Sequence, residues 1–180
     1  MMNLIRITSP DDRNLDRLIP LYEDAFPAEE RRDIGQLRRM IKEKSDMYFS
    51  VVECDGELCG FFVYWDMKDF YYLEHLAVYP SMRNKKIGQQ VLNYVADHLK
   101  GIRLLEVEPM QDEMTTRRVR YYQRNGYQVL EEEYIQPSYD GVRDSCPLWI
   151  MGNQHSERLP EFIETIKRKV YTDNYGLIEK

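Results

Sequence analysis

The sequence LEHLAVYPSMRNKKIGQQVL, residues 73–92, decides the fold. It reads as a β-strand up to Val78, a short turn beginning at Pro80, a basic segment ending at Gly88, and then an amphipathic helix. This order places free backbone N–H groups and the positive end of a helix dipole at one point, beside several cationic side chains. The stretch therefore predicts a site for phosphate groups at a strand-to-helix junction.

Composition indicates one globular domain. The chain has 180 residues, of which 43% are hydrophobic and 31% are charged, as is ordinary for a protein with a single core. Its 31 acidic and 25 basic residues give a net charge of −6. This charge argues against non-specific nucleic-acid binding, because no overall positive field attracts the phosphate backbone. We therefore expect no nucleic-acid partner.

The cysteines and the N-terminal residues give expectations about the compartment. The three cysteines lack metal-ligand spacing, so we expect free thiols and no metal site; a disulfide between Cys54 and Cys59 across a hairpin is the alternative. The first residues lack the long apolar region of a signal peptide, and no apolar run reaches membrane-spanning length. These features predict a cytoplasmic protein with no membrane partner.

Strands and helices alternate on both sides of residues 73–92. Asp55-Gly56 joins two strand-like runs as a hairpin, and a parallel crossover through the central helix leads to the strand that follows it. The expected strands are residues 4–7, 47–54, 57–65, 70–78, 102–107, 127–134 and 147–151. The expected helices lie between residues 9–12 and Pro27, around 34–41, at 87–99 and 113–125, and from Ser156 onward, with a mobile tail from Thr172.

The segment from Leu76 to Gly88 resembles the acetyl-CoA signature of the GCN5-related N-acetyltransferase (GNAT) superfamily. That signature is Gln/Arg-x-x-Gly-x-Gly/Ala; Arg83 matches its first position and Gly88 its last, whereas Lys86 replaces the middle glycine. Asn84 stands where many members carry glycine, and asparagine can adopt the left-handed backbone conformation. Lys86 keeps its backbone N–H and adds no negative charge, so the resemblance still implies pyrophosphate binding here.

A second resemblance lies in YYQRNGY, residues 121–127. It is similar to the family's helix that ends in aromatic-Tyr-x-x-x-Gly-Phe/Tyr, and Tyr122 falls on the usual tyrosine. Thr115, seven residues earlier, stands where the family often has an asparagine that contacts the pantetheine arm. The two motifs together are a fairly specific signal, although neither alone would be.

The family resemblance implies an α/β (α+β) fold with a mixed, mostly antiparallel central sheet of about six or seven strands and helices on both faces. Residues 1–155 would form the acetyltransferase domain, and residues 156–180 an extra C-terminal helix and tail packed on it. The implied activity is acetyl transfer from acetyl-CoA to a primary amine, by direct attack in a ternary complex. The implied donor-binding residues are Leu76, Ala77, Val78, Arg83, Asn84, Lys85, Lys86, Ile87, Gly88, Gln89 and Thr115.

This chemistry requires an acid and a base. An alkylamine of pKa about 10.4 must lose a proton before it attacks, and a thiolate of pKa about 8.5 leaves more easily beside a weak acid. Tyr122 is the candidate acid because of its place in the family motif. The base is a carboxylate, or a water that a carboxylate holds.

Two glutamates are candidate bases. Glu74 ranks first, because a carboxylate in an apolar strand is costly unless it is used or paired; strand alternation puts it on one face with Leu76 and puts His75, a structural histidine, on the other. Glu106 ranks just behind and resembles a glutamate that serves as base in some family members. The alternative is that either glutamate pairs with an arginine of residues 117–124.

The acceptor is left open by the sequence. Glu30, between the first two helices, and Tyr139 are candidate residues for a cationic small-molecule or peptide amine, although helix N-terminal charge placement explains Glu30 equally well. A non-catalytic acetyl-CoA sensor or scaffold is the alternative function. The C-terminal helix could also form a homodimer, which is compatible with catalysis.

Overall fold

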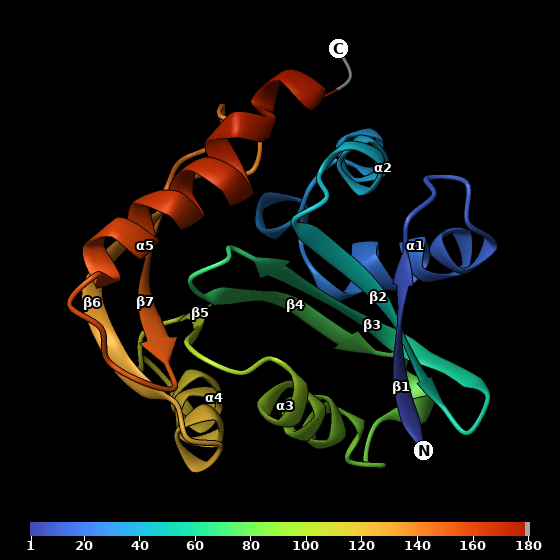
Figure 1. Ribbon diagram of the computed structural model, residues 1–180, viewed down its shortest axis with the longest axis horizontal. Coiled ribbons are helices and arrows are strands. Elements are labelled where there is room, and N and C mark those ends of the chain that lie inside the picture. Colours follow the sequence, from blue (N-terminus) through green and yellow to red (C-terminus); the bar gives the residue numbers. More distant parts are fainter. Residues whose placement is uncertain (179–180) are drawn as a thin grey trace.

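A seven-stranded sheet forms the centre of the computed structural model, which describes residues 1–178 (Figure 1). The strand order is β1-β2-β3-β4-β5-β7-β6. Within the described residues, β4 and β5 form the only parallel pair. The strands are β1 Met2–Ile7, β2 Met47–Cys54, β3 Glu57–Asp66, β4 Tyr71–Val78, β5 Arg103–Val107, β6 Gln128–Gln136 and β7 Cys146–Gly152. The sheet confirms the expected mixed, mostly antiparallel α/β fold.

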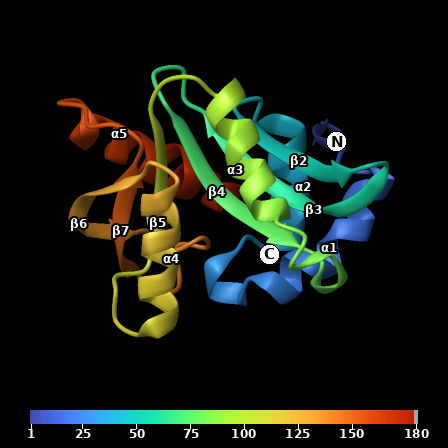
Figure 2. The ribbon, with the colours of Figure 1, turned by 90° about the horizontal axis from the view of Figure 1, so that it is seen from below.

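Helices cover both faces of this sheet (Figures 1 and 2). Helices α3 and α4 lie on one face, and α1, α2 and α5 on the other, each over its own cluster of buried apolar side chains. The helices are α1 Arg13–Ala25, α2 Ile34–Glu43, α3 Ile87–His98, α4 Glu113–Arg124 and α5 Leu159–Ile166. No helix of residues 1–178 is long and apolar enough to cross a membrane. The three cysteines are free thiols.

A β-bulge in β4 changes which face its side chains occupy. Val63 of β3 pairs with His75, and the next residue, Tyr64, pairs with Leu73, so Glu74 is the extra residue. The bulge puts Glu74 and His75 on the same face, where both contact Tyr139, whereas Leu73 joins the cluster under α3. The expected alternation of Glu74 and His75 is therefore wrong, because a bulge interrupts the strand's two-residue period. The expected shared face of Glu74 and Leu76 is wrong as well, since Leu76 packs on the α3 face.

Strands β4 and β5 diverge at the bulge. Their parallel pairing covers only residues 71–73 of β4 and 103–105 of β5. Beyond these residues, Glu74–Val78 pairs with β3 alone, and Glu106 pairs with β7. The two strands therefore splay apart, which opens the sheet beside both candidate bases.

The C-terminal segment packs on the same core as α1 and α2. Leu159, Phe162 and Ile166 of α5 belong to the buried cluster on that face. A π-helical turn, Lys167–Tyr171, and a 3-10 helix, Thr172–Leu177, follow α5. Asn174 is fully buried, so the mobile tail expected from Thr172 is wrong for this 3-10 helix. The last part of that expected tail, residues 179–180, lies outside the described residues.

Candidate functional site

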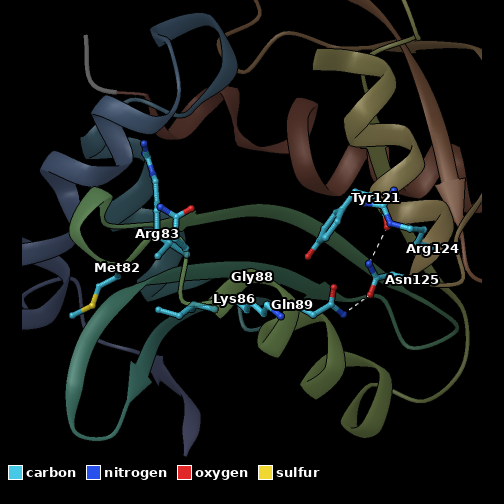
Figure 3. Close-up of a pocket in the computed structure, with 11 residues that line it drawn as sticks. Met82, Arg83, Lys86, Gly88, Gln89, Tyr121, Arg124 and Asn125 are labelled. Carbon is cyan, nitrogen blue, oxygen red and sulfur yellow. Dashed lines mark hydrogen bonds between the residues drawn. The ribbon is translucent and has the colours of Figure 1, made fainter. Parts of the chain in front are cut away.

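A groove of about 740 Å³ lies between the N-terminus of α3 and the C-terminus of α4 (Figure 3). Its floor is the segment from Arg83 to Gln89, and Tyr121 forms the opposite wall. Gln89 donates a hydrogen bond to Asn125 Oδ1 (2.6 Å), and Asn125 donates one to the backbone oxygen of Tyr121 (2.9 Å), so the two helix ends are tied together. The predicted phosphate segment therefore lines a groove.

The backbone of this segment exposes N–H groups. Asn84 and Lys86 both have left-handed conformations, with φ of 70° and 57°. Lys86 is the N-cap of α3, and its side chain does not cap the helix. Helices α1, α2 and α4 are each capped by an aspartate side chain, which satisfies a backbone N–H that α3 leaves free. The α3 N-terminus thus has the partial positive charge that suits an anion.

Lys86 adopts the backbone conformation of the glycine that it replaces. We expect Lys86→Gly to raise the free energy of unfolding by about 0.5–1 kcal/mol, because the relief of left-handed strain exceeds the entropy that glycine adds to the unfolded chain. Urea unfolding measures the change. Lys86→Ala is the matched control: it removes the same charge, keeps the strain, and should gain nothing. Equal stability of the two variants would contradict the argument.

The other predicted donor-binding residues have different places. Arg83 extends away from Gly88 in Figure 3, and the Lys85 ammonium lies 3.6 Å from Met82 Sδ. Thr115 is buried in a capping box at the start of α4, where its hydroxyl accepts from the Asp112 N–H (3.0 Å) and it does not line the groove. Its predicted contact with the pantetheine arm stays a prediction.

A small cavity of about 40 Å³ lies where β4 and β5 diverge. Both candidate bases, Glu74 and Glu106, line it together with the candidate acid Tyr122. Tyr122 packs edge-on against Tyr121 and Tyr127, and burial raises its pKa to about 12. Tyr122 therefore keeps its proton at neutral pH and can donate a hydrogen bond into this cavity.

Glu74 is fully paired. Arg32 binds both of its carboxylate oxygens, the Trp65 indole N–H donates to Oε1 (2.7 Å), and the Tyr139 hydroxyl donates to Oε2 (2.9 Å). Burial alone would raise the pKa of Glu74, but the Arg32 charge, His75 and these hydrogen bonds outweigh it and lower the pKa. A carboxylate held in this way is a weak base. Its partner is Arg32, outside the α4 arginines considered from the sequence.

Glu106 has the opposite environment. The hydroxyls of Tyr72 and Tyr171 and the amide of Gln136 all donate to Oε1. Oε2 is buried and has no hydrogen-bond partner among residues 1–178. Burial raises the pKa of Glu106, against the lowering effect of the nearby Tyr134 hydroxyl and of these three donors. An ionisable oxygen without a partner, beside a cavity, is suited to accept a proton from a ligand.

His75 is buried beside Glu74. Burial lowers the pKa of His75 to about 4, so its ring is neutral at physiological pH. Its Nε2 lies 3.1 Å from the backbone oxygen of Glu30 and 3.3 Å from the Tyr139 hydroxyl. These contacts join β4 to the segment after α1 and agree with the structural place expected for this histidine.

A cleft of about 490 Å³ leads from the small cavity to the surface and shares Glu74, His75, Glu106 and Tyr122 with it. Its outer part carries four further carboxylates and one arginine: Glu29, Glu30, Glu108, Asp144 and Arg118. Partial burial and the charges of Glu108 and Glu29 raise the pKa of Glu30. Tyr139 also lines the cleft, but its hydroxyl is used by Glu74. The cleft is therefore acidic.

Arg32 is the residue that the sequence reasoning missed. It is 1% exposed and donates to Val170 O (3.0 Å) as well as to Glu74, so it joins the segment between α1 and α2 to β4 and to the C-terminal segment. The sequence holds one weak signal, the Arg31-Arg32 pair that follows two glutamates. That pattern is typical of a solvated surface run.

Comparison with known proteins identifies the family. A family model described as an acetyltransferase (GNAT) domain matches residues 45–129. A solved structure described as "Putative acetyltransferase from GNAT family", from Bacteroides thetaiotaomicron, is 30% identical with a TM-score of 0.89, over 94% of this chain and 98% of that chain. The chain belongs to the GNAT family of acetyltransferases, whose acetyl donor is acetyl-CoA.

Two further relatives are more distant. The Bacillus subtilis (strain 168) protein "Putative acetyltransferase YjbC" is 29% identical over 104 residues, which are 57% of this chain and about half (52%) of that protein. An aminoglycoside 6'-N-acetyltransferase complexed with coenzyme A is 19% identical with a TM-score of 0.55, over 84% of this chain and 95% of that chain. At this identity the second likeness shows the fold alone.

Proposed function

We propose that this protein transfers an acetyl group from acetyl-CoA to a primary amine of an acceptor with more than one positive charge. The observation that carries the proposal is the acidic cleft, which ends at the cavity shared by Glu106 and Tyr122. A cationic acceptor would be attracted to this cleft because its carboxylates outnumber its one arginine, Arg118, which pairs with Glu108 (3.5 Å). The acceptor's reacting amine would then meet Glu106 Oε2, the buried carboxylate oxygen that has no hydrogen-bond partner among residues 1–178.

The groove at α3 suits the donor's phosphates. Its uncapped backbone N–H groups, the left-handed Asn84 and Lys86, and the Lys86 ammonium are the features that favour a pyrophosphate. The β4 backbone at residues 76–78, which β5 leaves unpaired, offers hydrogen-bonding groups for amides of the pantetheine arm. When bound, acetyl-CoA supplies the acetyl group as a thioester.

We assign the proton-transfer roles to Glu106 and Tyr122. Glu106 Oε2 accepts a proton from the acceptor's ammonium group and leaves the amine nitrogen free to attack. As the C–N bond forms and the C–S bond breaks, Tyr122 donates a hydrogen bond to the departing sulfur, because its raised pKa keeps the hydroxyl protonated. The second proton that the attacking nitrogen loses leaves with CoA as its thiol. Glu74, the first candidate from the sequence, instead holds Arg32, Trp65 and Tyr139 in place around the cleft.

A thiol-release assay tests this function. Purified protein with acetyl-CoA should release free CoA with amines of two or more positive charges, at a higher kcat/KM than with a monoamine, and added salt should reduce the difference. A panel of propylamine, putrescine, spermidine, an aminoglycoside and a lysine-containing peptide covers these cases. Coenzyme A binding without turnover across the panel would contradict the proposal and favour the sensor alternative.

The acidic residues of the cleft give a matched test. Glu30→Gln and Glu108→Gln should each raise KM for the best polyamine about two- to fivefold, as expected for partly exposed charges worth about 0.5–1 kcal/mol. Glu132→Gln, an exposed carboxylate of β6 outside the cleft, is the control and should leave KM unchanged. Equal KM values in all three variants would show that the cleft does not select for charge.

A further inference from the structure

The C-terminal segment reaches the interior of the site. Tyr171 ends the π-helical turn Lys167–Tyr171 and is fully buried. Its hydroxyl donates to Glu106 Oε1, accepts from Gln136 Nε2 (3.0 Å), and lies 3.4 Å from the Tyr72 hydroxyl. A segment beyond the matched family domain, which ends at residue 129, thus supplies a direct partner of the proposed base.

Several contacts fix the segment at this depth. Arg32 donates to Val170 O (3.0 Å), and so does the buried Asn174 side chain (2.9 Å). Gln36 of α2 donates to Asn174 O (3.1 Å). A π-helical turn is rare and widens the helix, and such turns are frequent at functional sites. The turn and these contacts place Tyr171 against Glu106 and leave little freedom for its ring.

The donors on Glu106 are distributed unequally. Oε1 accepts hydrogen bonds from Tyr171, Tyr72 and Gln136, whereas Oε2 accepts no hydrogen bond within residues 1–178. Three donors on one oxygen orient the carboxylate and stabilise its ionised form. Without them only the Tyr134 hydroxyl would oppose the desolvation that favours the neutral form of the buried carboxylate.

We propose that Tyr171 is a positioning residue for the acetyl-transfer reaction: it holds Oε1 of Glu106 and so directs the free Oε2 to the acceptor amine. This inference rests on the proposed role of Glu106 as the base. The titratable groups that face Glu106 or share its cavities come from every element around it: Tyr72, Glu74 and His75 of β4, Glu29 and Glu30 after α1, Glu108 after β5, Arg118 and Tyr122 of α4, Tyr134 of β6, Tyr139 and Asp144 before β7, Cys146 of β7, and Tyr171.

The test measures the pKa of Glu106 directly. Protein labelled with ¹³C at glutamate carboxyls is titrated by NMR, and the Glu106 resonance is the one that Glu106→Gln removes. Tyr171→Phe should raise the pKa of Glu106 by about one unit, because a hydrogen bond to an ionised group is lost. The control is Tyr175→Phe in the same C-terminal segment. It removes a hydroxyl that donates to Ser138 O (2.7 Å) and should leave the pKa of Glu106 unchanged.

A second variant distinguishes loss of the hydrogen bond from loss of the fold. Replacement of Tyr171 by difluorotyrosine keeps the ring and the hydroxyl but makes the hydroxyl a stronger donor, so the pKa of Glu106 should fall. Shifts in opposite directions for the two Tyr171 variants support the proposal. An unchanged pKa of Glu106 in a folded Tyr171 variant would overturn it.

Kinetics separates this inference from the proposed function. The acid limb is the fall of kcat as the pH decreases. If Glu106 is the base, Tyr171→Phe should shift the pH of this fall by the same amount as the Glu106 pKa measured by NMR. If the Glu106 pKa changes but the acid limb does not, Tyr171 does contact Glu106, but Glu106 is not the base. The positioning function of Tyr171 would then fail together with the proposed function. If the Glu106 pKa is unchanged in Tyr171→Phe but the acid limb disappears in Glu106→Gln, the inference is overturned and the proposed function stands.

Discussion

Arg32→Met should lower the free energy of unfolding by about 3–5 kcal/mol, as is typical when one partner of a buried ion pair is removed. The side chains of Arg32 and Glu74 are 1% and 0% exposed. Methionine retains most of the volume of the arginine stem but no charge, so Glu74 would stay buried with only neutral donors. The variant would also lose the hydrogen bond to Val170 O that anchors the C-terminal segment. Urea unfolding at neutral pH measures the loss.

Two comparisons isolate the buried charge. Arg117→Met removes an exposed arginine, 75% accessible and paired with Glu113, and should change stability by less than about 0.5 kcal/mol. The double variant Arg32→Met/Glu74→Gln should be more stable than Arg32→Met alone, because a neutral amide costs less to bury than an unpaired carboxylate. A double variant as unstable as the sum of both single variants would show that the pair is not coupled.

The effect of Arg32→Met should also depend on pH. The folded-state pKa of Glu74 is lowered because the Arg32 charge and its hydrogen bonds outweigh burial. This pair therefore contributes stability above the unfolded-state pKa of about 4.3, and the contribution is lost as the pH falls through the folded-state value. The stability difference between the wild type and Arg32→Met should thus be largest near neutral pH and shrink in acid.

The conformation of residues 73–92 could be predicted because its signals are local. Residues 73–92 contain the strand, the turn and the helix start in sequence order, and the left-handed Asn84 and Lys86 follow the family's glycine pattern. Tyr122 was likewise located by a motif within its own helix. Each of these predictions depends on neighbours only a few residues away, where backbone periodicity and turn chemistry act.

The role of Glu74 could not be predicted because its determinants are distant or irregular. The β-bulge that turns Glu74 onto the face of Tyr139 has no glycine to mark it in the sequence. Its ionic partner, Arg32, is 42 residues earlier. A carboxylate in an apolar strand predicts that the group is either used or paired, but only the fold distinguishes the two.

The environment of Glu106 illustrates the same limit. Its three hydrogen-bond donors come from β4, from β6 and from the C-terminal segment. Tyr171 lay at the end of an expected helix, directly before an expected mobile tail. Apolar periodicity identifies the buried face of such a helix but not a π-helical turn, which shifts the side chains that follow it.

Glu106→Gln should lower kcat by about 10²–10⁴-fold with the amine that the thiol-release screen selects, as expected for loss of a general base. Glutamine keeps the size and can still meet the donors on Oε1, but its amide cannot take the ammonium proton. Binding of coenzyme A, measured by calorimetry, should stay unchanged, because the α3 groove does not include Glu106. Tyr122→Phe should also lower kcat, by weakening departure of the thiolate, but it should keep the pH dependence that the base imposes.

The pH profile gives this last prediction its sharpest form. Burial raises the pKa of Glu106, so wild-type kcat should begin to fall, as the pH decreases, at a higher pH than an ordinary glutamate would impose. The limb arises because a protonated Glu106 cannot accept the ammonium proton. In Glu106→Gln that limb should disappear from the residual activity. A limb that persists in Glu106→Gln at the same pH would belong to the amine or to another group, and would exclude Glu106 as the base.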